Sequence, residues 1–342
     1  MTAGLRVLNV SKARPGEFPW FDGRLPPDLG ARFIHCRGGP ANSLERRITR
    51  PNIALQRGCM QAAWHVARGE VDLIVSHLPV VTQWTEFYLQ GTRRSVPHIA
   101  FSFNQDPMPT GIKRAALARL FRNVDRFVVF STAECELYAK AFGIPRERLH
   151  MFHWGVVPPQ ADPADPPVVE GEYITSIGRT HRNYADLVEA MRRLPHIRCI
   201  VVAGFDNLAG LDVPPNVEVL TEIPFSQVLN VLYHSRMLVL PLHDTDVPYG
   251  HGTAVLGMHM RRPVVVTEGR AMSDYIKEGE TGITFPAGDH DRLAEHITGL
   301  LADEQRAAQL AQSAYTFAQE FCTEEATLKK VIPLLLETRR AG

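Results

Sequence analysis

Short apolar runs alternate with segments of helical spacing along the first half of the chain. The predicted strands are rich in branched residues and end in polar or glycine-bearing turns; they are residues 5–10, 31–36, 71–76, 98–103 and 125–131. Between them, residues 54–69 and 112–123 carry apolar side chains at helical spacing. Strands separated by helices pair in parallel through right-handed crossovers. The first half is therefore predicted to be a doubly wound α/β domain.

A proline-rich stretch interrupts this alternation. Residues 156–171 read VVPPQADPADPPVVEG, and their five prolines fit neither a helix interior nor a central strand. The alternation then restarts, with predicted strands at 173–178, 198–204, 217–221 and 237–242 and predicted helices at 184–194, 225–235 and 292–303. We therefore expect a second α/β domain of similar size. Ligands of open α/β sheets bind at the carboxyl ends of the strands, so we expect a cleft that both domains face.

Composition and charge narrow the function. The chain has 342 residues, which is long for one core and natural for two domains. Its 37 basic and 37 acidic side chains balance, so nothing in the net charge favours nucleic acid. The five cysteines stand singly, without metal-like spacing, and their odd number fits a reducing compartment. No apolar signal segment or spanning run is present, and we expect a cytoplasmic protein.

Three segments follow one another in a recognisable order. Residues 124–159 combine a buried strand ending in serine, a helix, a glycine and proline, and a short strand closing on Trp154-Gly155. Residues 174–191 combine a strand, a Gly-Arg loop and a helix, and residues 263–297 contain a strand pair and a turn that ends in Gly-Asp. This series resembles the retaining glycosyltransferases of the GT-B fold, family 4 or group 1. The resemblance implies two Rossmann-like domains of doubly wound parallel sheets.

The resemblance also implies a domain layout. Residues 1–157 would form the acceptor-side domain, and residues 158–171 the linker. Residues 172–314 would bind the nucleotide sugar, and the helices of residues 315–342 would cross back to the first domain.

The implied activity is transfer of a hexose-like sugar from a nucleotide-activated donor to an acceptor, with retention of anomeric configuration. In such enzymes the nucleoside diphosphate departs from the face that the acceptor attacks, and its phosphate accepts the proton of the acceptor. The protein supplies positioning and phosphate electrostatics. We expect no metal and no other cofactor, and we interpret Asp244 and Asp246 as loop carboxylates rather than as metal ligands.

The Gly-Arg loop is the first candidate donor site. Gly178 ends a predicted strand, and Arg179 and Arg182 follow it just before a predicted helix. A diphosphate leaving group needs cationic donors, and a helix N-terminus adds backbone N–H groups. The family resemblance assigns Arg179 and Arg182 to the diphosphate of the donor, with Arg179 also counted as catalytic. The alternative is that both arginines are solvated surface charges.

The segment DVPYGHGTAVLGMHMRRPVVV, residues 246–266, departs from the family pattern. Typical relatives carry two glutamates eight positions apart here, and alignment on Pro263 places Pro248 and Leu256 at those positions. A leucine cannot accept hydrogen bonds from a ribose diol, so ribose recognition must differ. We expect a glycine-rich loop to hold the donor through backbone N–H groups and a hydroxyl. Its candidate residues are Gly250, His251, Gly252 and Thr253.

The first domain supplies three further candidates. His77 directly follows a predicted strand and matches a His-x-Pro position of the family. Asn104 occupies the place where many relatives carry a sugar-contacting histidine; we count His77 and Asn104 as catalytic candidates. Gly16 lies in the early loop 11–23, where relatives place glycines near the donor, and the aromatic residues of that loop could shape the acceptor site. A single histidine among 14 is more often structural than functional.

The predicted helix at 112–123 is basic and amphipathic. Family members that act on lipid carriers use such a helix for attachment, so the resemblance implies peripheral contact with the inner membrane face. The interpretation that we favour from the residues themselves is a solvated face packed on the sheet.

Two alternatives to transfer remain on the same scaffold. One is a pseudo-glycosyltransferase or a non-catalytic protein that binds sugars or nucleotides, which the two missing glutamates favour. The other is a nucleotide-sugar epimerase, which would need acids and histidines that the sequence does not place.

Overall fold

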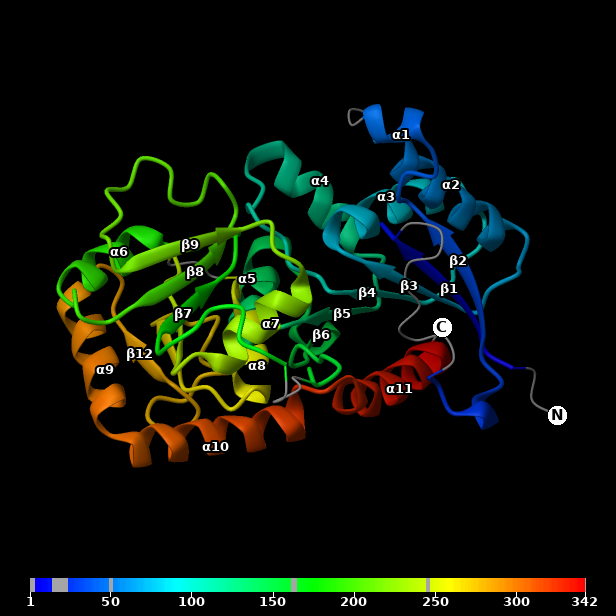
Figure 1. Cartoon of the computed structure of the whole chain (residues 1–342). Helices are drawn as coiled ribbons and strands as arrows, with labels where there is room; N and C mark the ends of the chain where they lie inside the picture. Colours follow the sequence, from blue (N-terminus) through cyan, green and yellow to red (C-terminus); the bar gives the residue numbers. More distant parts are fainter. Residues whose placement is uncertain (1–3, 14–23, 49–51, 161–164, 244–246, 342) are drawn as a thin grey trace. The chain divides into compact units, whose positions relative to one another are not determined.

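The computed structural model describes residues 4–13, 24–48, 52–160, 165–243 and 247–341. The chain divides into two compact units. Unit 1 comprises Met1–Phe152 together with Leu328–Gly342, and unit 2 comprises His153–Thr327. Each unit is built around its own parallel sheet (Figure 1).

Unit 1 contains a six-stranded sheet in the order β2-β1-β3-β4-β5-β6, and all its pairings are parallel. Its strands are β1 (Arg6–Ser11), β2 (Arg32–Arg37), β3 (Leu73–His77), β4 (His98–Phe101), β5 (Arg126–Val129) and β6 (Leu149–Met151). Its helical segments are η1 (Pro27–Leu29), α1 (Ser43–Arg47), α2 (Ile53–Ala67), α3 (Pro79–Leu89), α4 (Gly111–Phe121), α5 (Thr132–Phe142) and η2 (Arg146–Arg148). The predicted α/β alternation is confirmed.

Helix α3 was not predicted from the sequence. Its first residues, Pro79, Val80, Val81 and Thr82, include three β-branched side chains, which lower helix propensity and resemble a strand. The helix begins because Leu78 adopts a positive φ of 76° and Pro79 occupies the first helical position. Tertiary burial of the helix outweighs the local signal.

A cluster of aromatic rings forms part of the core of unit 1. Phe103 lies edge-on against Phe121, Phe127 and Tyr138, with ring centroids 5.0 Å, 5.0 Å and 5.1 Å away. Edge-to-face contacts of this kind add to the burial of apolar area. Phe103 lies just beyond β4, so the cluster fixes the loop that carries Asn104.

Unit 2 contains a second six-stranded parallel sheet, in the order β12-β11-β10-β7-β8-β9. Its strands are β7 (Ile174–Ile177), β8 (Cys199–Ala203), β9 (Val217–Thr221), β10 (Leu238–Leu240), β11 (Val264–Thr267) and β12 (Ile283–Phe285). Its helices are α6 (Tyr184–Arg192), α7 (Phe225–His234), α8 (His251–His259), α9 (His290–Ala302) and α10 (Glu304–Phe321), and α11 (Glu324–Ala341) carries the chain back into unit 1. Two such sheets flanked by helices confirm the predicted α/β fold class.

The strand order of unit 2 creates one switch point. From β7 the chain proceeds outward to β8 and β9, and it then returns to β10 on the other side of β7. Loops that follow β7 and β10 therefore diverge at their carboxyl ends and leave a crevice between them, the usual ligand position in open α/β sheets. Gly178 follows β7, and the loop before α8 follows β10.

The unit boundaries differ from the predicted positions of 157 and 315. His153 and Trp154 already belong to unit 2, because His153 Nε2 bonds to the carbonyl oxygen of Asp274 at 2.9 Å and the Trp154 amide donates to the Tyr275 hydroxyl at 2.9 Å. Helix α10 also belongs to unit 2, since it packs on α8 and α9. The return to unit 1 therefore begins at Leu328.

In the proline-rich segment, the described residues 158–160 and 165–171 contain no helix or strand. No helix in the part of the chain that the structure describes is long and apolar enough to cross a membrane.

Candidate functional site in unit 2

Arg182 lies at the centre of the candidate donor site. It is only 9% exposed, and its guanidinium is held on three sides by neutral acceptors. Nε donates to the carbonyl oxygen of Ile177, Nη1 to that of Thr180 and Nη2 to the hydroxyl of Thr253, each at 3.0 Å. Arg182 thus joins the loop after β7 to the first turn of α8.

Two glycines make room for this guanidinium. A Cβ on Gly178 would lie 2.4 Å from Nη2 of Arg182, and one on Gly250 would lie 3.2 Å from Nη1. Both glycines also have positive φ angles, of 135° and 79°, which other residues rarely adopt. This explains why Gly250 precedes α8 in the segment that lacks the expected glutamates. Gly250 and Gly178 together enclose a buried arginine.

Arg182 has no carboxylate partner among the residues that the structure describes. Burial lowers the pKa of its guanidinium, but arginine still stays charged at neutral pH. The N-terminus of α8 begins beside it and adds the positive end of the helix dipole. An uncompensated buried charge is costly, so this corner of unit 2 is suited to receive an anion.

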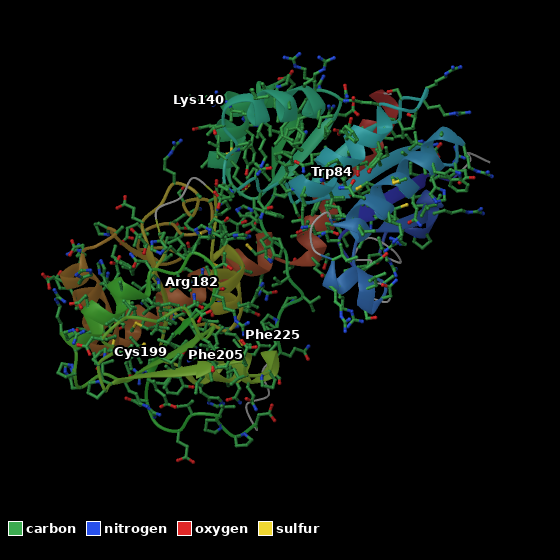
Figure 2. All side chains as sticks on the ribbon, turned by 90° about the horizontal axis from the view of Figure 1, so that it is seen from above. Trp84, Lys140, Arg182, Cys199, Phe205 and Phe225 are labelled. Atoms are coloured by element: carbon green, nitrogen blue, oxygen red, sulfur yellow. The ribbon has the colours of Figure 1, made fainter. Side chains whose placement is uncertain are left out.

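A pocket of about 280 Å³ adjoins Arg182. Its walls come from the loop after β7, the segment after β9, α7 and α8; they include Gly178, Arg179, Glu222, Ile223, Phe225, Thr253 and Leu256. Figure 2 labels Arg182 within unit 2, together with Phe205 and Phe225, two large hydrophobic side chains that are exposed. The pocket therefore combines an apolar floor with charged and hydroxyl groups at its edge.

Arg179 lies at the edge of this pocket, in a setting unlike that of Arg182. Its guanidinium pairs with Glu222 at 2.8 Å, and the two side chains are 58% and 54% exposed. A pair so open to water contributes little to stability, so either partner is available to a ligand. Glu222 was not among the site residues predicted from the sequence. Its only local signal is its position directly after β9, at the carboxyl edge of the sheet.

His251 has a structural contact within the site. Its Nδ1 donates to the carbonyl oxygen of Pro248 at 2.7 Å, which fixes the loop before α8. Its ring packs against Trp154 and Tyr275, with centroids 5.3 Å and 5.6 Å away. Burial lowers the pKa of His251 to about 4, so the imidazole is neutral at pH 7. Gly252 follows in the same turn, 3.6 Å from Trp154 measured at the Cβ position.

The two catalytic candidates of unit 1 lie at the carboxyl ends of neighbouring strands: His77 is the last residue of β3, and Asn104 lies beyond β4. His77 Nε2 donates to Asn9 Oδ1 at 2.8 Å, and Asn9 Nδ2 lies 3.2 Å from Nδ1 of His35. Burial, assisted by His35, lowers the pKa of His77 to about 4, so it is neutral at pH 7. Asn104 is half-buried, and its side-chain amide has no hydrogen-bond partner among the described residues.

Three residues of the sequence analysis lie outside the described residues: Gly16, Asp244 and Asp246. Within the described ranges, no group of three or more His, Cys, Asp or Glu side chains is arranged to hold a metal ion.

Comparison with known proteins identifies the family that a segment of unit 2 matches. The family model described as glycosyl transferases group 1 matches residues 171–303. This segment belongs to the group 1 glycosyltransferases. The resemblance to group 1 glycosyltransferases is thereby confirmed for this segment, so the chain carries a glycosyltransferase domain. No match was found among curated proteins.

Solved structures support the two-domain fold of this glycosyltransferase. A glycosyltransferase from Rickettsia africae is 14% identical, with a TM-score of 0.73 over 98% of both chains. HepE from Anabaena, in complex with UDP and glucose, is 15% identical, with a TM-score of 0.73 over 97% of this chain and 100% of its own. Sucrose-phosphate synthase from Thermosynechococcus elongatus is 19% identical, with a TM-score of 0.71 over 98% of this chain and 89% of its own. These likenesses confirm the GT-B fold.

Gly178→Ala tests the packing around Arg182. The new Cβ would clash with the guanidinium and occupy an unfavourable φ, so we expect the free energy of unfolding to fall by about 2 kcal/mol or more. Gly299→Ala is the matched control, because a Cβ there meets nothing within 4 Å and lies inside α9. That change should stabilise by up to about 1 kcal/mol. Urea denaturation measures both, and equal stability of the two variants would contradict the packing described.

Proposed function

We propose that this glycosyltransferase moves a sugar from a nucleoside diphosphate sugar to an acceptor, with retention of anomeric configuration and without a metal. The observation that carries the proposal is the buried guanidinium of Arg182 beside the N-terminus of α8, which pairs with no carboxylate of the described residues. A diphosphate placed there compensates both positive groups. The crystal structures of HepE with UDP and with UDP-glucose support this class of donor.

The donor would occupy unit 2 as follows. Its diphosphate meets Arg182, the backbone N–H groups at Gly250, His251 and Gly252, and the hydroxyl of Thr253. Arg179 supplies a second, exposed guanidinium at the same edge. The charge that develops on the leaving phosphate during transfer is then stabilised by donors that are already in position.

The nucleoside would occupy the adjoining pocket of about 280 Å³. Leu256 lines it at the position of the missing ribose-binding glutamate, and leucine offers no acceptor. Glu222 lines the same pocket and carries a carboxylate. We propose that Glu222 accepts the hydrogen bonds of the ribose, and that Phe225 provides an aromatic face for the base.

The remaining chemistry needs little from protein acids or bases. The departing phosphate accepts the proton of the acceptor hydroxyl, and the protein holds the reactants in place. His77 is neutral and hydrogen-bonded, and Asn104 offers an amide, so both are proposed to orient a sugar or acceptor hydroxyl. Neither needs to ionise in this account.

A nucleotide panel tests the proposal. UDP, GDP, ADP, dTDP and their sugars are added to the wild type, and we expect one nucleotide to raise the melting temperature by several degrees. Arg179→Ala removes one charged contact and should weaken that nucleotide about tenfold. Arg192→Ala is the control, because Arg192 is a surface arginine of α6 outside the pocket, and it should bind as the wild type does.

The reaction itself distinguishes the alternatives. With the selected donor, proton NMR of the product should show that the transferred sugar keeps the anomeric configuration that it had in the donor. Nucleotide binding without transfer or hydrolysis would favour a pseudo-glycosyltransferase or a binding protein, and interconversion of the sugar without an acceptor would favour an epimerase. Absence of binding by every nucleotide would contradict a donor site at Arg182.

We further propose that α4 makes peripheral contact with an anionic membrane. Ile112 is 90% exposed at the start of α4. No acidic residue occurs between Asp106 and Asp125, but this stretch contains four basic residues: Lys113, Arg114, Arg119 and Arg122. Exposed cations beside an exposed apolar side chain favour anionic lipid.

Vesicle cosedimentation tests the role of α4. Lys113→Glu should reduce binding to anionic vesicles. Lys140→Glu makes the same change at an exposed lysine of α5 and should reduce binding less. Equal effects of the two changes would contradict a specific role for α4.

A further inference from the structure

Unit 1 contains a second pocket, at the amino ends of its strands. Its volume is about 440 Å³, and it lies where β1, β3 and β4 begin. The last helix, α11, supplies Arg339 to its wall. His77 and Asn104 follow the carboxyl ends of β3 and β4, at the opposite edge of the same sheet. The pocket is therefore separate from the residues assigned to transfer.

One side of the pocket is a rigid ion pair. Arg6 Nη2 lies 2.6 Å from Asp72 Oδ1, Nε donates to Asp72 Oδ2 at 3.1 Å, and Nη1 donates to the carbonyl oxygen of Gly69 at 2.9 Å. The two-point contact fixes the Arg6 guanidinium in the wall. Asp72 also balances the charge of Arg6.

Two other arginines in the wall have no such balance. Neither Arg94 nor Arg339 has a carboxylate partner or a side-chain hydrogen bond within the described part of the chain. Arg94 lies over Gly69, where a Cβ would come within 2.5 Å of its Nη1, so the glycine lets the guanidinium rest against the backbone. The charge of Arg339 helps to keep the pKa of Asp72 low. The lining therefore carries three guanidiniums and one carboxylate.

We propose that this pocket binds a phosphate-bearing ligand with at least two negative charges. Planar guanidiniums match the oxygens of phosphate groups, and the surplus of two guanidiniums over the single carboxylate of the lining sets the minimum charge. Ser95 adds a hydroxyl, and Val71, Val96 and Pro97 add an apolar wall. The volume exceeds what a bare phosphate fills, so a phosphate ester or a lipid phosphate fits better than the free ion.

Inorganic pyrophosphate is the probe, measured by titration calorimetry on the full chain. The variant Arg94→Ala/Arg339→Ala should weaken its binding about 100-fold, since each lost charged contact is worth about tenfold. The control is Arg93→Ala/Arg46→Ala, which removes two exposed arginines of unit 1 that do not line the pocket. We expect the control to stay within about twofold of the wild type.

Ser95→Glu keeps both arginines and places a carboxylate in the pocket. It should also abolish this binding, while the melting temperature of each variant shows that it is folded. Pyrophosphate also probes the donor site proposed in unit 2, so Arg179→Ala is titrated in parallel. Arg179→Ala should weaken pyrophosphate binding at the donor site of unit 2 and leave binding at the pocket of unit 1 unchanged. Loss of one site can therefore be told apart from loss of the other.

Two arms distinguish the source of the phosphate. Cosedimentation with phosphatidylcholine vesicles that contain phosphatidic acid, lost in Arg94→Ala/Arg339→Ala and kept in the control pair, indicates a lipid phosphate. If the wild type binds pyrophosphate but the two double variants cosediment equally with the vesicles, the ligand is a soluble phosphate compound. Equal affinity of the two double variants for pyrophosphate, or no pyrophosphate binding outside the donor site, would overturn the proposal.

Discussion

The site of unit 2 depends on the burial of one guanidinium, that of Arg182, to which the described residues offer no carboxylate. Three neutral acceptors hold Arg182 in place, but they do not cancel its charge. Gly178 and Gly250 have to be glycines so that the guanidinium fits between their backbones. The first turn of α8 adds a further positive dipole to the same place. In the absence of a ligand this arrangement costs stability, which is typical of groups arranged for binding rather than for folding.

The fold explains why these parts meet. In unit 2 the chain leaves β7 in one direction and returns to β10 on its other side, so the loops after β7 and β10 share one crevice. The Gly-Arg loop and the first turn of α8 are about 70 positions apart in the chain, as the hydrogen bond between Arg182 and Thr253 records. Unit 1 uses the same architecture, with His77 at the end of β3 and Asn104 in the loop after β4.

Much of this could be predicted from the sequence, for identifiable reasons. The strands are short runs of buried branched residues, and the helices have regular apolar spacing, so most of both sheets followed from pattern alone. The strands β6, β11 and β12 were expected only from the family resemblance. Arg179 and Arg182 were recognised together, but the sequence could not show that Arg179 is exposed and pairs with Glu222, whereas Arg182 is buried and bonds only to neutral acceptors among the described residues. That difference arises from Gly250 and Thr253, which only the fold brings near.

Glu222 was missed because its proximity to Arg179 depends on the order of β7, β8 and β9. Helix α3 was missed because its β-branched start resembles a strand. The pocket lined by Arg6, Arg94 and Arg339 combines residues from both ends of the chain and has no local signal.

The most direct test of the central claim is NMR of the arginine side chains. The Nε–Hε resonance of Arg182, assigned by its loss in Arg182→Lys, is followed in a nitrogen-15 labelled chain during titration with the nucleoside diphosphate that the panel selects. If the diphosphate compensates the buried charge, this resonance should shift in a saturable manner, with the same dissociation constant that calorimetry gives. A resonance that stays unchanged while the nucleotide binds would show that the diphosphate lies elsewhere, and it would contradict the role assigned to Arg182.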